Sequence, residues 1–261
     1  MLDKNLKDTL FLCLKESAKI LRRGFGSKLK ITKKGPINIV TEIDMASEKK
    51  IISLIKKKFP DHRILAEESS PKEGSSPFRW IIDPLDGTTN YAHHLNLFCT
   101  SIGVEYQGEM ILGGIYNPIQ NELYFAEKGK GATLNGRRIH VSKNTNLSEC
   151  LLVTGFPYDT PKRARFYLEY FRRFLQRAQG IRRLGSAALD LAYVASGTFD
   201  AFWEFNLKPW DMAAGILVVK EAGGQVTNFS GKILSVDTPQ QLLASNAKIH
   251  SHLLNIFKKK N

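Results

Sequence analysis

The chain has 261 residues, 43% of them hydrophobic and 10% aromatic, which is the composition of a globular protein with a substantial core. It has no low-complexity tract typical of disorder and no apolar run of the ~18 residues that a membrane-spanning helix needs. The formal net charge of +13 is compatible with a nucleic-acid partner or an anionic substrate. The basic residues are scattered, however, and several fall at expected helix ends, which favours ordinary solvated surface.

The N-terminal segment predicts two helices. In the first, apolar side chains recur at helical spacing before Gly24: Leu6, Leu10, Cys13, Leu14, Ala18 and Leu21. Charges interrupt this segment, so it is typical of an amphipathic helix and not of a signal peptide, and a cytoplasmic location is expected. The second helix begins at Thr41-Glu42-Ile43-Asp44, a capping-box pattern, and ends before Pro60.

Strand-like segments follow. Short apolar runs occupy residues 63–66 and 79–82. The runs at 99–106, 110–116 and 122–126 are separated by turn residues, which predicts an antiparallel meander. Asn135-Gly136 is a strong hairpin turn.

The composition turns polar over residues 142–148, and we place a domain boundary between residues 145 and 146. Beyond it the pattern predicts strands at 151–154 and 242–245 and helices at 161–179, 187–196, 210–222 and 249–257. Because strands and helices occur in groups in both halves, we expect a layered α/β (α+β) sandwich and not a strict βαβ wound fold.

Residues 80–91, WIIDPLDGTTNY, carry the strongest functional signal. An apolar strand runs into Asp83 and Asp86, and then into the small hydroxylated turn Gly87-Thr88-Thr89-Asn90. A carboxylate at an apolar strand end needs a compensating charge, which a hard cation with oxygen ligands supplies. The turn offers N–H groups and hydroxyls to an anion such as phosphate. The segment therefore predicts metal-dependent phosphate chemistry.

Other polar signals are ambiguous on their own. Glu67-Glu68 follows a short strand, but acid pairs usually face water. Asp211 opens an expected helix, where the helix dipole favours aspartate whether or not it has a function. His93-His94 follows the motif, but hard cations select oxygen over imidazole, so we expect these histidines to be loop residues or to contact the metal ligands without binding the metal.

Five motifs occur in the order that is found in one family: VTEID (residues 40–44), AEES (66–69), DPLDGTTN (83–90), WDMAAG (210–215) and EAGG (221–224). Through them the chain resembles the inositol monophosphatase family of magnesium-dependent sugar phosphatases, which is related to fructose-1,6-bisphosphatase. The resemblance implies an αβαβα sandwich of the sugar-phosphatase type, with two mixed or antiparallel sheets and helices between and outside them. An N-terminal domain, residues 1–145, would carry most metal ligands. A C-terminal domain, residues 146–261, would carry Asp211 and the contacts to the substrate ring.

The resemblance also implies roles for single residues. The metal ligands would be Glu67, Asp83, the Leu85 carbonyl, Asp86 and Asp211. The catalytic residues would be Asp44, Thr88 and Glu67, of which Asp44 and Thr88 would orient the attacking water and help to deprotonate it. The phosphate would be held by Gly87, Thr88 and Thr89. The substrate ring would contact Asp86, Gly185, Ser186, Glu204, Asp211 and Arg182. A mobile loop over the site would carry Lys33.

The cofactor implied is Mg²⁺, two or three ions, with Mn²⁺ as a substitute and Li⁺ and Ca²⁺ as inhibitors. The substrate expected first is inositol-1-phosphate, because a glutamate at the Glu204 position hydrogen-bonds a ring hydroxyl in the family. Arg182-Arg183 keeps fructose-1,6-bisphosphate open, alone or beside inositol phosphate, since a second phosphate favours guanidinium partners. Histidinol phosphate also stays open, whereas the GTTN turn lacks the lysine of nucleotide-directed relatives and disfavours an adenosine bisphosphate.

The partners expected are a small phosphate ester and a second copy of the chain in a homodimer, with no membrane association. The alternative from another class is an RNA-associated regulatory protein that keeps the same fold. The charge of +13 motivates that alternative. A complete set of acidic ligands argues against it, because a scaffold without activity has little reason to retain every acid.

Overall fold

The computed structural model describes residues 4–237 and 240–258. Its helices are α1 (Lys4–Gly24), α2 (Glu42–Lys58), α3 (Thr88–Ala92), the 3₁₀ helix η1 (Leu147–Glu149), α4 (Thr160–Leu175), α5 (Ala187–Ala195), α6 (Pro209–Glu221) and α7 (His250–Lys258). Its strands are β1 (Ile31–Lys33), β2 (Ile39–Thr41), β3 (Arg63–Ala66), β4 (Phe78–Asp86), β5 (Cys99–Tyr106), β6 (Glu109–Asn117), β7 (Glu122–Glu127), β8 (Gly131–Leu134), β9 (Arg137–Arg138), β10 (Leu151–Thr154), β11 (Gly180–Arg182), β12 (Ala201–Leu207), β13 (Gln225–Thr227) and β14 (Gln240–Ser245).

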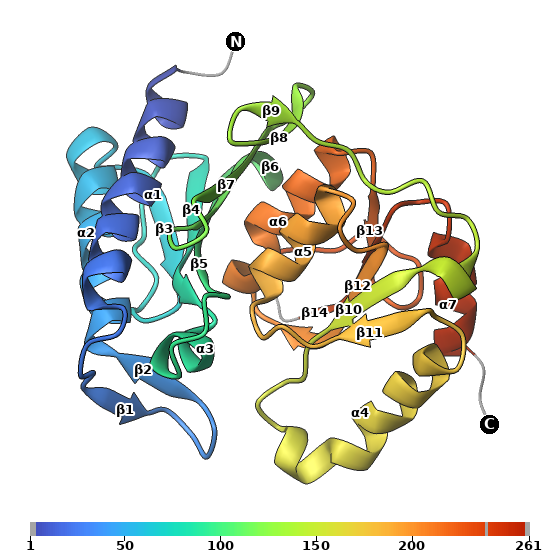
Figure 1. Ribbon diagram of the computed structural model, residues 1–261. Helices are drawn as coiled ribbons and strands as arrows, with labels where there is room; N and C mark the ends of the chain where they lie inside the picture. The colour runs from blue at the N-terminus through green and yellow to red at the C-terminus, as the bar shows by residue number, and fades with distance from the viewer. Residues whose placement is uncertain (1–3, 238–239, 259–261) are drawn as a thin grey trace.

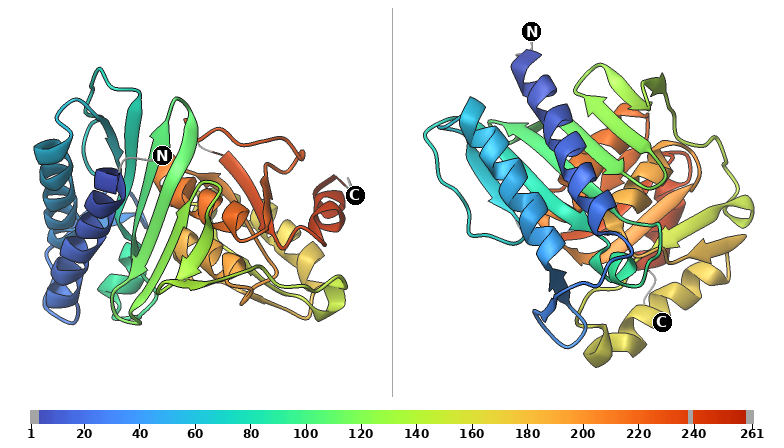
Figure 2. Two further views of the ribbon diagram at one scale, coloured as in Figure 1. Left: turned by 90° about the horizontal axis from the view of Figure 1, so that it is seen from above. Right: turned by 60° about the vertical axis from the view of Figure 1, so that its left-hand side comes forward.

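These elements stack in five layers (Figures 1 and 2). Helices α1 and α2 cover the outer face of a seven-stranded sheet, and α4 and α7 cover the outer face of a five-stranded sheet. Helices α5 and α6 lie between the two sheets. The αβαβα sandwich implied by the family resemblance is thus confirmed. No helix of the described residues is long and apolar enough to cross a bilayer.

The outer and central helices differ in sequence because they differ in burial. Helix α1 buries one stripe, which includes Leu6, Leu10 and Leu14, and exposes the rest. Every residue of α5 is buried, and α5 accordingly consists almost entirely of apolar, mostly small residues. Its alanines suit the narrow space between two sheets.

The seven-stranded sheet has the order β3-β4-β5-β6-β7-β8-β9. Strands β3 and β4 pair in parallel, and all other neighbours are antiparallel. The predicted meander from β5 to β7 is confirmed, as is the hairpin at Asn135-Gly136, which joins β8 to β9. The β4–β5 register shifts between Asp83 and Asp86, so the DPLD segment departs from regular pairing.

The five-stranded sheet has the order β11-β10-β12-β14-β13, and β10 pairs in parallel with both of its neighbours. The sequence patterns did not identify β11 or β12. Strand β12 is buried at every position except Asn206, because it lies in the middle of the sheet with helices on both faces. A strand buried on both faces lacks the alternation by which half-buried strands are recognised.

One predicted helix end and one predicted turn were wrong. The helix expected to run to residue 179 ends at Leu175, because the Gln179 N–H donates to the Cys150 carbonyl at 3.0 Å and the chain then enters β11. The segment expected as a turn after Gly87 is the short helix α3, closed by the Tyr91 N–H bond to the Gly87 carbonyl at 3.0 Å. Because of this second difference, the Thr88-Thr89-Asn90 part of the DPLDGTTN motif lies in the first turn of a helix.

The two halves of the chain share packing. Helix α6 contacts β4, β5 and β6 of the first sheet as well as β13 and β14 of the second. Glu221 at the end of α6 accepts hydrogen bonds from the Gly129 and Gly131 N–H groups at 2.8 and 2.7 Å, which ties the EAGG motif to the β7–β8 turn. The division at residues 145 and 146 stays a prediction, and its outer ends, residues 1–3 and 259–261, lie outside the described residues.

His250 predicts how stability varies with pH. Its ring is buried, with Nε2 2.9 Å from Thr227 Oγ1 and Nδ1 2.8 Å from Ser245 Oγ. Burial lowers the pKa of His250 from 6.5 to about 4. Because the folded state resists protonation, its full contribution to stability is present above pH 6.5 and is lost as the pH falls toward 4. We expect the denaturant midpoint of His250→Asn to fall less steeply than that of the wild type over this window. Parallel curves would show that other groups carry the acid sensitivity.

Candidate active site

A cavity of about 640 Å³ lies where the two halves meet. Its walls come from the end of β4, the start of α3, the starts of α5 and α6, the end of β12 and the segments 34–38 and 155–159. It is lined by most of the residues predicted for the site, namely Glu67, Asp83, Leu85, Asp86, Gly87, Thr88, Thr89, Gly185, Ser186, Glu204 and Asp211. The structure therefore gathers residues that are up to 144 positions apart, from Glu67 to Asp211, in one place.

Local hydrogen bonds fix the acids of β4. The Leu85 N–H donates to Asp83 Oδ1 at 2.9 Å, and Asp83 is only 1% exposed. Asp86 Oδ2 accepts from Ser186 Oγ at 2.6 Å and from the Ala188 N–H at 2.7 Å. The start of α5, with its N–H groups and positive dipole end, thus holds this carboxylate from the second half of the chain.

Asp211 combines a structural and a site position. Its Oδ2 accepts from the Lys208 N–H at 2.6 Å, a capping contact at the start of α6. The same residue lines the cavity. The helix-dipole explanation of this aspartate is therefore correct but incomplete.

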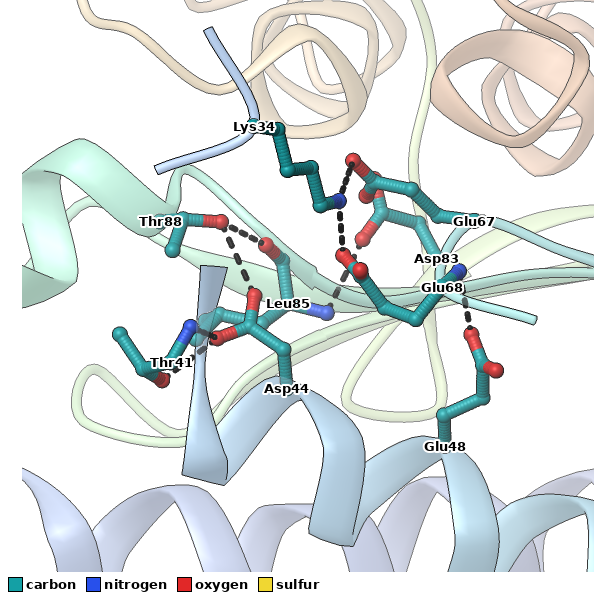
Figure 3. Close-up of polar contacts among 9 residues, drawn as sticks. All are labelled: Lys34, Thr41, Asp44, Glu48, Glu67, Glu68, Asp83, Leu85 and Thr88. Carbon is teal, nitrogen blue, oxygen red and sulfur yellow. Dashed lines mark hydrogen bonds and ion pairs between the residues drawn. The ribbon is translucent and has the colours of Figure 1, made fainter. Parts of the chain in front are cut away.

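The two acids of the AEES segment lie beside a lysine from another part of the chain (Figure 3). Lys34 Nζ lies 3.2 Å from Glu67 Oε1 and 2.5 Å from Glu68 Oε1. The Glu68 N–H donates to Glu48 Oε2 at 2.8 Å, which anchors the segment to α2. Lys34 lines the cavity, whereas Lys33, predicted on a mobile loop over the site, is exposed at the end of β1 and is not part of the lining.

The site concentrates negative charge in an apolar setting. Burial is the largest cause that raises the pKa of Asp83 and of Asp211 well above the ordinary value, and neighbouring carboxylates raise both further. Burial likewise raises the pKa of Asp86, and that of Glu67 to about 7 although Lys34 opposes the shift. The buried acids outnumber the basic side chains that line the cavity, Lys34, Arg183 and Lys208, and oxygen ligands of this kind fit a hard divalent cation. As the structure stands, no three acidic, histidine or cysteine side chains of the described residues form a ready metal-binding group.

Asp44 and Thr88 lie within hydrogen-bonding distance of each other (Figure 3). Asp44 Oδ2 accepts from the Thr41 N–H at 2.9 Å and from Thr41 Oγ1 at 2.5 Å, and these bonds complete the predicted capping box of α2. Thr88 Oγ1 lies 3.1 Å from Asp44 Oδ1 and 3.0 Å from the Leu85 carbonyl, so its one proton serves either acceptor. Burial raises the pKa of Asp44 to about 6, and at neutral pH this carboxyl is an ionised proton acceptor.

Gly87 has the backbone conformation that lets α3 begin at the edge of the cavity. It has a φ of 92°, in the left-handed region, and a Cβ there would lie 2.9 Å from the Leu97 carbonyl oxygen. Any larger residue would displace the turn that presents Thr88 and Thr89 to the cavity. The arrangement leaves N–H groups and hydroxyls beside the acids, which suits a phosphate group next to a cation.

The far end of the cavity contains groups that the sequence prediction missed or misplaced. Arg183 lines the cavity, whereas Arg182 is exposed on β11 and its Nη1 donates to the Ile181 carbonyl at 3.1 Å. Asp190 was not predicted: it is 1% exposed, lines the cavity, and neither carboxylate oxygen has a hydrogen-bond partner among the described residues. The available signal was one acid inside the apolar run of α5. His93 and His94 do not line the cavity.

The fold and this site define a metal-dependent phosphoric monoester hydrolase, in which clustered acids adjoin a turn that offers N–H groups and hydroxyls. The model of the inositol monophosphatase family matches residues 4–261, and the chain belongs to this family.

Relatives of two names are similar to the chain. It is 46% identical over 231 residues to the inositol-1-monophosphatase of Synechocystis sp., covering 88% of this chain and 80% of that protein. It is 42% identical to the Nus factor SuhB of Pseudomonas aeruginosa, covering 87% of this chain and 85% of the relative. Among solved structures, the extragenic suppressor protein suhB of Bartonella henselae has a TM-score of 0.94 and 41% identity, covering 99% of this chain and all of that one.

Proposed function

We propose that the chain hydrolyses myo-inositol monophosphate to myo-inositol and inorganic phosphate, with Mg²⁺ as cofactor. The observation that carries this proposal is the single cavity that gathers Glu67, Asp83, Asp86 and Asp211 beside the Gly87-Thr88-Thr89 turn. The metal ligands would be these four carboxylates and the Leu85 carbonyl. Bound there, Mg²⁺ would supply charge neutralisation and lower the pKa of coordinated water.

The residues of the chain would divide the remaining work. Gly87, Thr88 and Thr89 would hold the phosphate by N–H groups and hydroxyls. Asp44 would accept the proton of the attacking water, directly or through the Thr88 hydroxyl that lies between Asp44 and the Leu85 carbonyl. Attack of the water oxygen on phosphorus would form a new P–O bond and break the P–O bond to the alcohol. The leaving oxygen would take a proton from solvent water, and Asp44 would return its proton to solvent.

The distal end of the cavity favours a neutral polyol over a second phosphate. Glu204 and Asp190 are both buried there, and burial raises the pKa of Glu204 to about 8. A protonated Glu204 would donate a hydrogen bond to a ring hydroxyl. Arg183 is the basic side chain at this end, and the neighbouring acids would weaken its hold on another anion. We therefore rank inositol phosphate above fructose-1,6-bisphosphate, with histidinol phosphate as a further candidate.

Phosphate release from purified protein tests the proposal. The substrates would be inositol-1-phosphate, fructose-1,6-bisphosphate, histidinol phosphate and adenosine-3′,5′-bisphosphate, each with Mg²⁺ and with excess chelator. We expect the highest kcat/KM on inositol-1-phosphate, loss of turnover in chelator, and inhibition by Li⁺ and Ca²⁺. Undiminished turnover in chelator would refute the metal mechanism, and a higher kcat/KM on another ester would reassign the substrate. Sedimentation of the same sample tests the homodimer.

A regulatory function in RNA metabolism is the second candidate. It is favoured by the charge of +13 and by the name Nus factor of the Pseudomonas aeruginosa relative. RNA affinity that falls steeply and linearly in log salt, together with no turnover on any ester, would favour it over the enzyme.

A further inference from the structure

A buried group of three hydroxyls lies beneath the DPLD segment. Ser17 of α1, Ser47 of α2 and Thr100 of β5 are each at most 1% exposed. Ser17 Oγ lies 2.7 Å from Ser47 Oγ and 2.5 Å from Thr100 Oγ1. Ser47 Oγ and Thr100 Oγ1 both lie within reach of the Pro84 carbonyl oxygen, at 3.2 and 3.1 Å. We call these three residues the hydroxyl triad.

The triad replaces hydrogen bonds that the sheet does not provide. The β4–β5 register shifts between Asp83 and Asp86, so Pro84 and Leu85 fall outside the regular ladder. A buried carbonyl that loses its ladder partner needs another donor. Two side chains reach the Pro84 carbonyl, Ser47 from helix α2 and Thr100 from strand β5. The carbonyl is therefore held from two directions.

A proton count shows that the triad can donate to this carbonyl whichever of its two partners Ser17 donates to. Three hydroxyls supply three protons for four contacts. If Ser17 donates to Ser47, then Ser47 has its own proton for the Pro84 oxygen. If Ser17 donates to Thr100, then Thr100 does. Either order leaves the Pro84 carbonyl held by a hydroxyl.

The held carbonyl in turn orients an acid of the site. The peptide between Pro84 and Leu85 is a rigid plane, in which the carbonyl and the N–H point in opposite directions. With the carbonyl directed at the triad, the Leu85 N–H points to the other side, where it donates to Asp83 Oδ1 at 2.9 Å (Figure 3). The Leu85 carbonyl is fixed as well, by Thr88 Oγ1 at 3.0 Å.

We infer that Ser47 and Thr100, joined through Ser17, are positioning residues that orient the Asp83 carboxylate for the metal. This inference rests on the proposed metal site. Residues that orient metal ligands typically change metal affinity or activity by about 10–100-fold when they are replaced. A merely structural hydroxyl would change stability and leave metal affinity alone.

The test is Mn²⁺ binding to the full chain. Binding is measured as the loss of the electron paramagnetic resonance signal of the free ion. Ser47→Ala combined with Thr100→Val leaves the Pro84 carbonyl without a donor, and Thr100→Val keeps the shape of the side chain. We expect this double variant to bind Mn²⁺ about 10–100-fold more weakly than the wild type. Thr100→Ser keeps the hydroxyl and should bind within about twofold. Thr227→Val is the matched control, because it also removes a buried hydroxyl, the one that hydrogen-bonds to His250, from strand β13 of the five-stranded sheet.

The outcomes separate the inference from the proposed function. The double variant could bind Mn²⁺ within about twofold of the wild type and lose thermal stability as Thr227→Val does. That result would overturn the inference and leave the proposed function standing. If the double variant does not fold, Ser47→Cys combined with Thr100→Val decides, because a thiol fills the position of the hydroxyl but is only a weak donor. We expect about tenfold weaker binding from this second double variant, and unchanged binding would refute the inference. Failure of the wild type to bind Mn²⁺ would overturn the proposed metal site and the inference with it.

Discussion

Replacing Asp83 by Asn should abolish Mg²⁺-dependent phosphate release, by on the order of 10³-fold or more, and should also stabilise the metal-free protein. The two effects have one cause. Asp83 is buried at 1% exposure among Glu67, Asp86 and Asp211, and its pKa is raised by burial first and by those charges next. An amide keeps the shape of the side chain and its bond from the Leu85 N–H, but it removes a charge that only a cation compensates.

Two thermal melts and one assay check this result. Without metal, the melting temperature of Asp83→Asn should exceed that of the wild type. With Mg²⁺, the wild type should gain stability by ligand binding and the variant should gain little. Asp61→Asn, at an exposed position outside the cavity, is the control and should match the wild type in both. A variant that keeps its activity, or whose metal-free form is less stable than the wild type, would show that the Asp83 charge does not act as proposed.

Local sequence patterns predicted much of the fold because many elements have one face toward water. The meander from β5 to β7, the amphipathic α1 and the capping box of α2 all show this, since their periodicity or capping chemistry is visible along the chain. Strand β12 was missed for the opposite reason: it is buried on both faces and has no periodicity. The end of α4 was misplaced because β11 pairing, a contact distant in sequence, decides where the helix stops.

The site divides along similar lines. Asp83 and Asp86 could be predicted from the residues themselves, because acids at the end of an apolar strand need an explanation. Glu67 and Asp211 looked ordinary locally, and it was the family resemblance that pointed to them. Lys34 and Arg183 line the cavity, whereas the sequence analysis named their neighbours, Lys33 on a loop over the site and Arg182 as a contact to the substrate ring. The sequence does not display which of two adjacent basic side chains faces a cavity. Asp190 becomes evident only when burial shows that both of its oxygens lack partners among the described residues.

Asp44 belongs to both the fold and the site, since its carboxylate caps α2 through Oδ2 and faces Thr88 through Oδ1. Its two functions can be separated by two variants. Asp44→Asn removes the proton acceptor, and we expect kcat to fall about 10²–10⁴-fold. Thr41→Ala removes the capping hydroxyl and keeps the carboxylate, so we expect a loss of stability of about 1 kcal/mol and a far smaller loss of kcat.

The pH dependence sharpens this comparison. The Thr41 hydrogen bonds lower the pKa of Asp44, against the burial that raises it to about 6. Without the Thr41 hydroxyl this pKa should rise further, so less of the carboxyl is ionised near pH 6 than in the wild type, while both are ionised at pH 8. The activity deficit of Thr41→Ala should therefore be larger at pH 6 than at pH 8. Equal deficits of Thr41→Ala and Asp44→Asn at pH 8 would mean that the cap, and not proton acceptance, accounts for the loss.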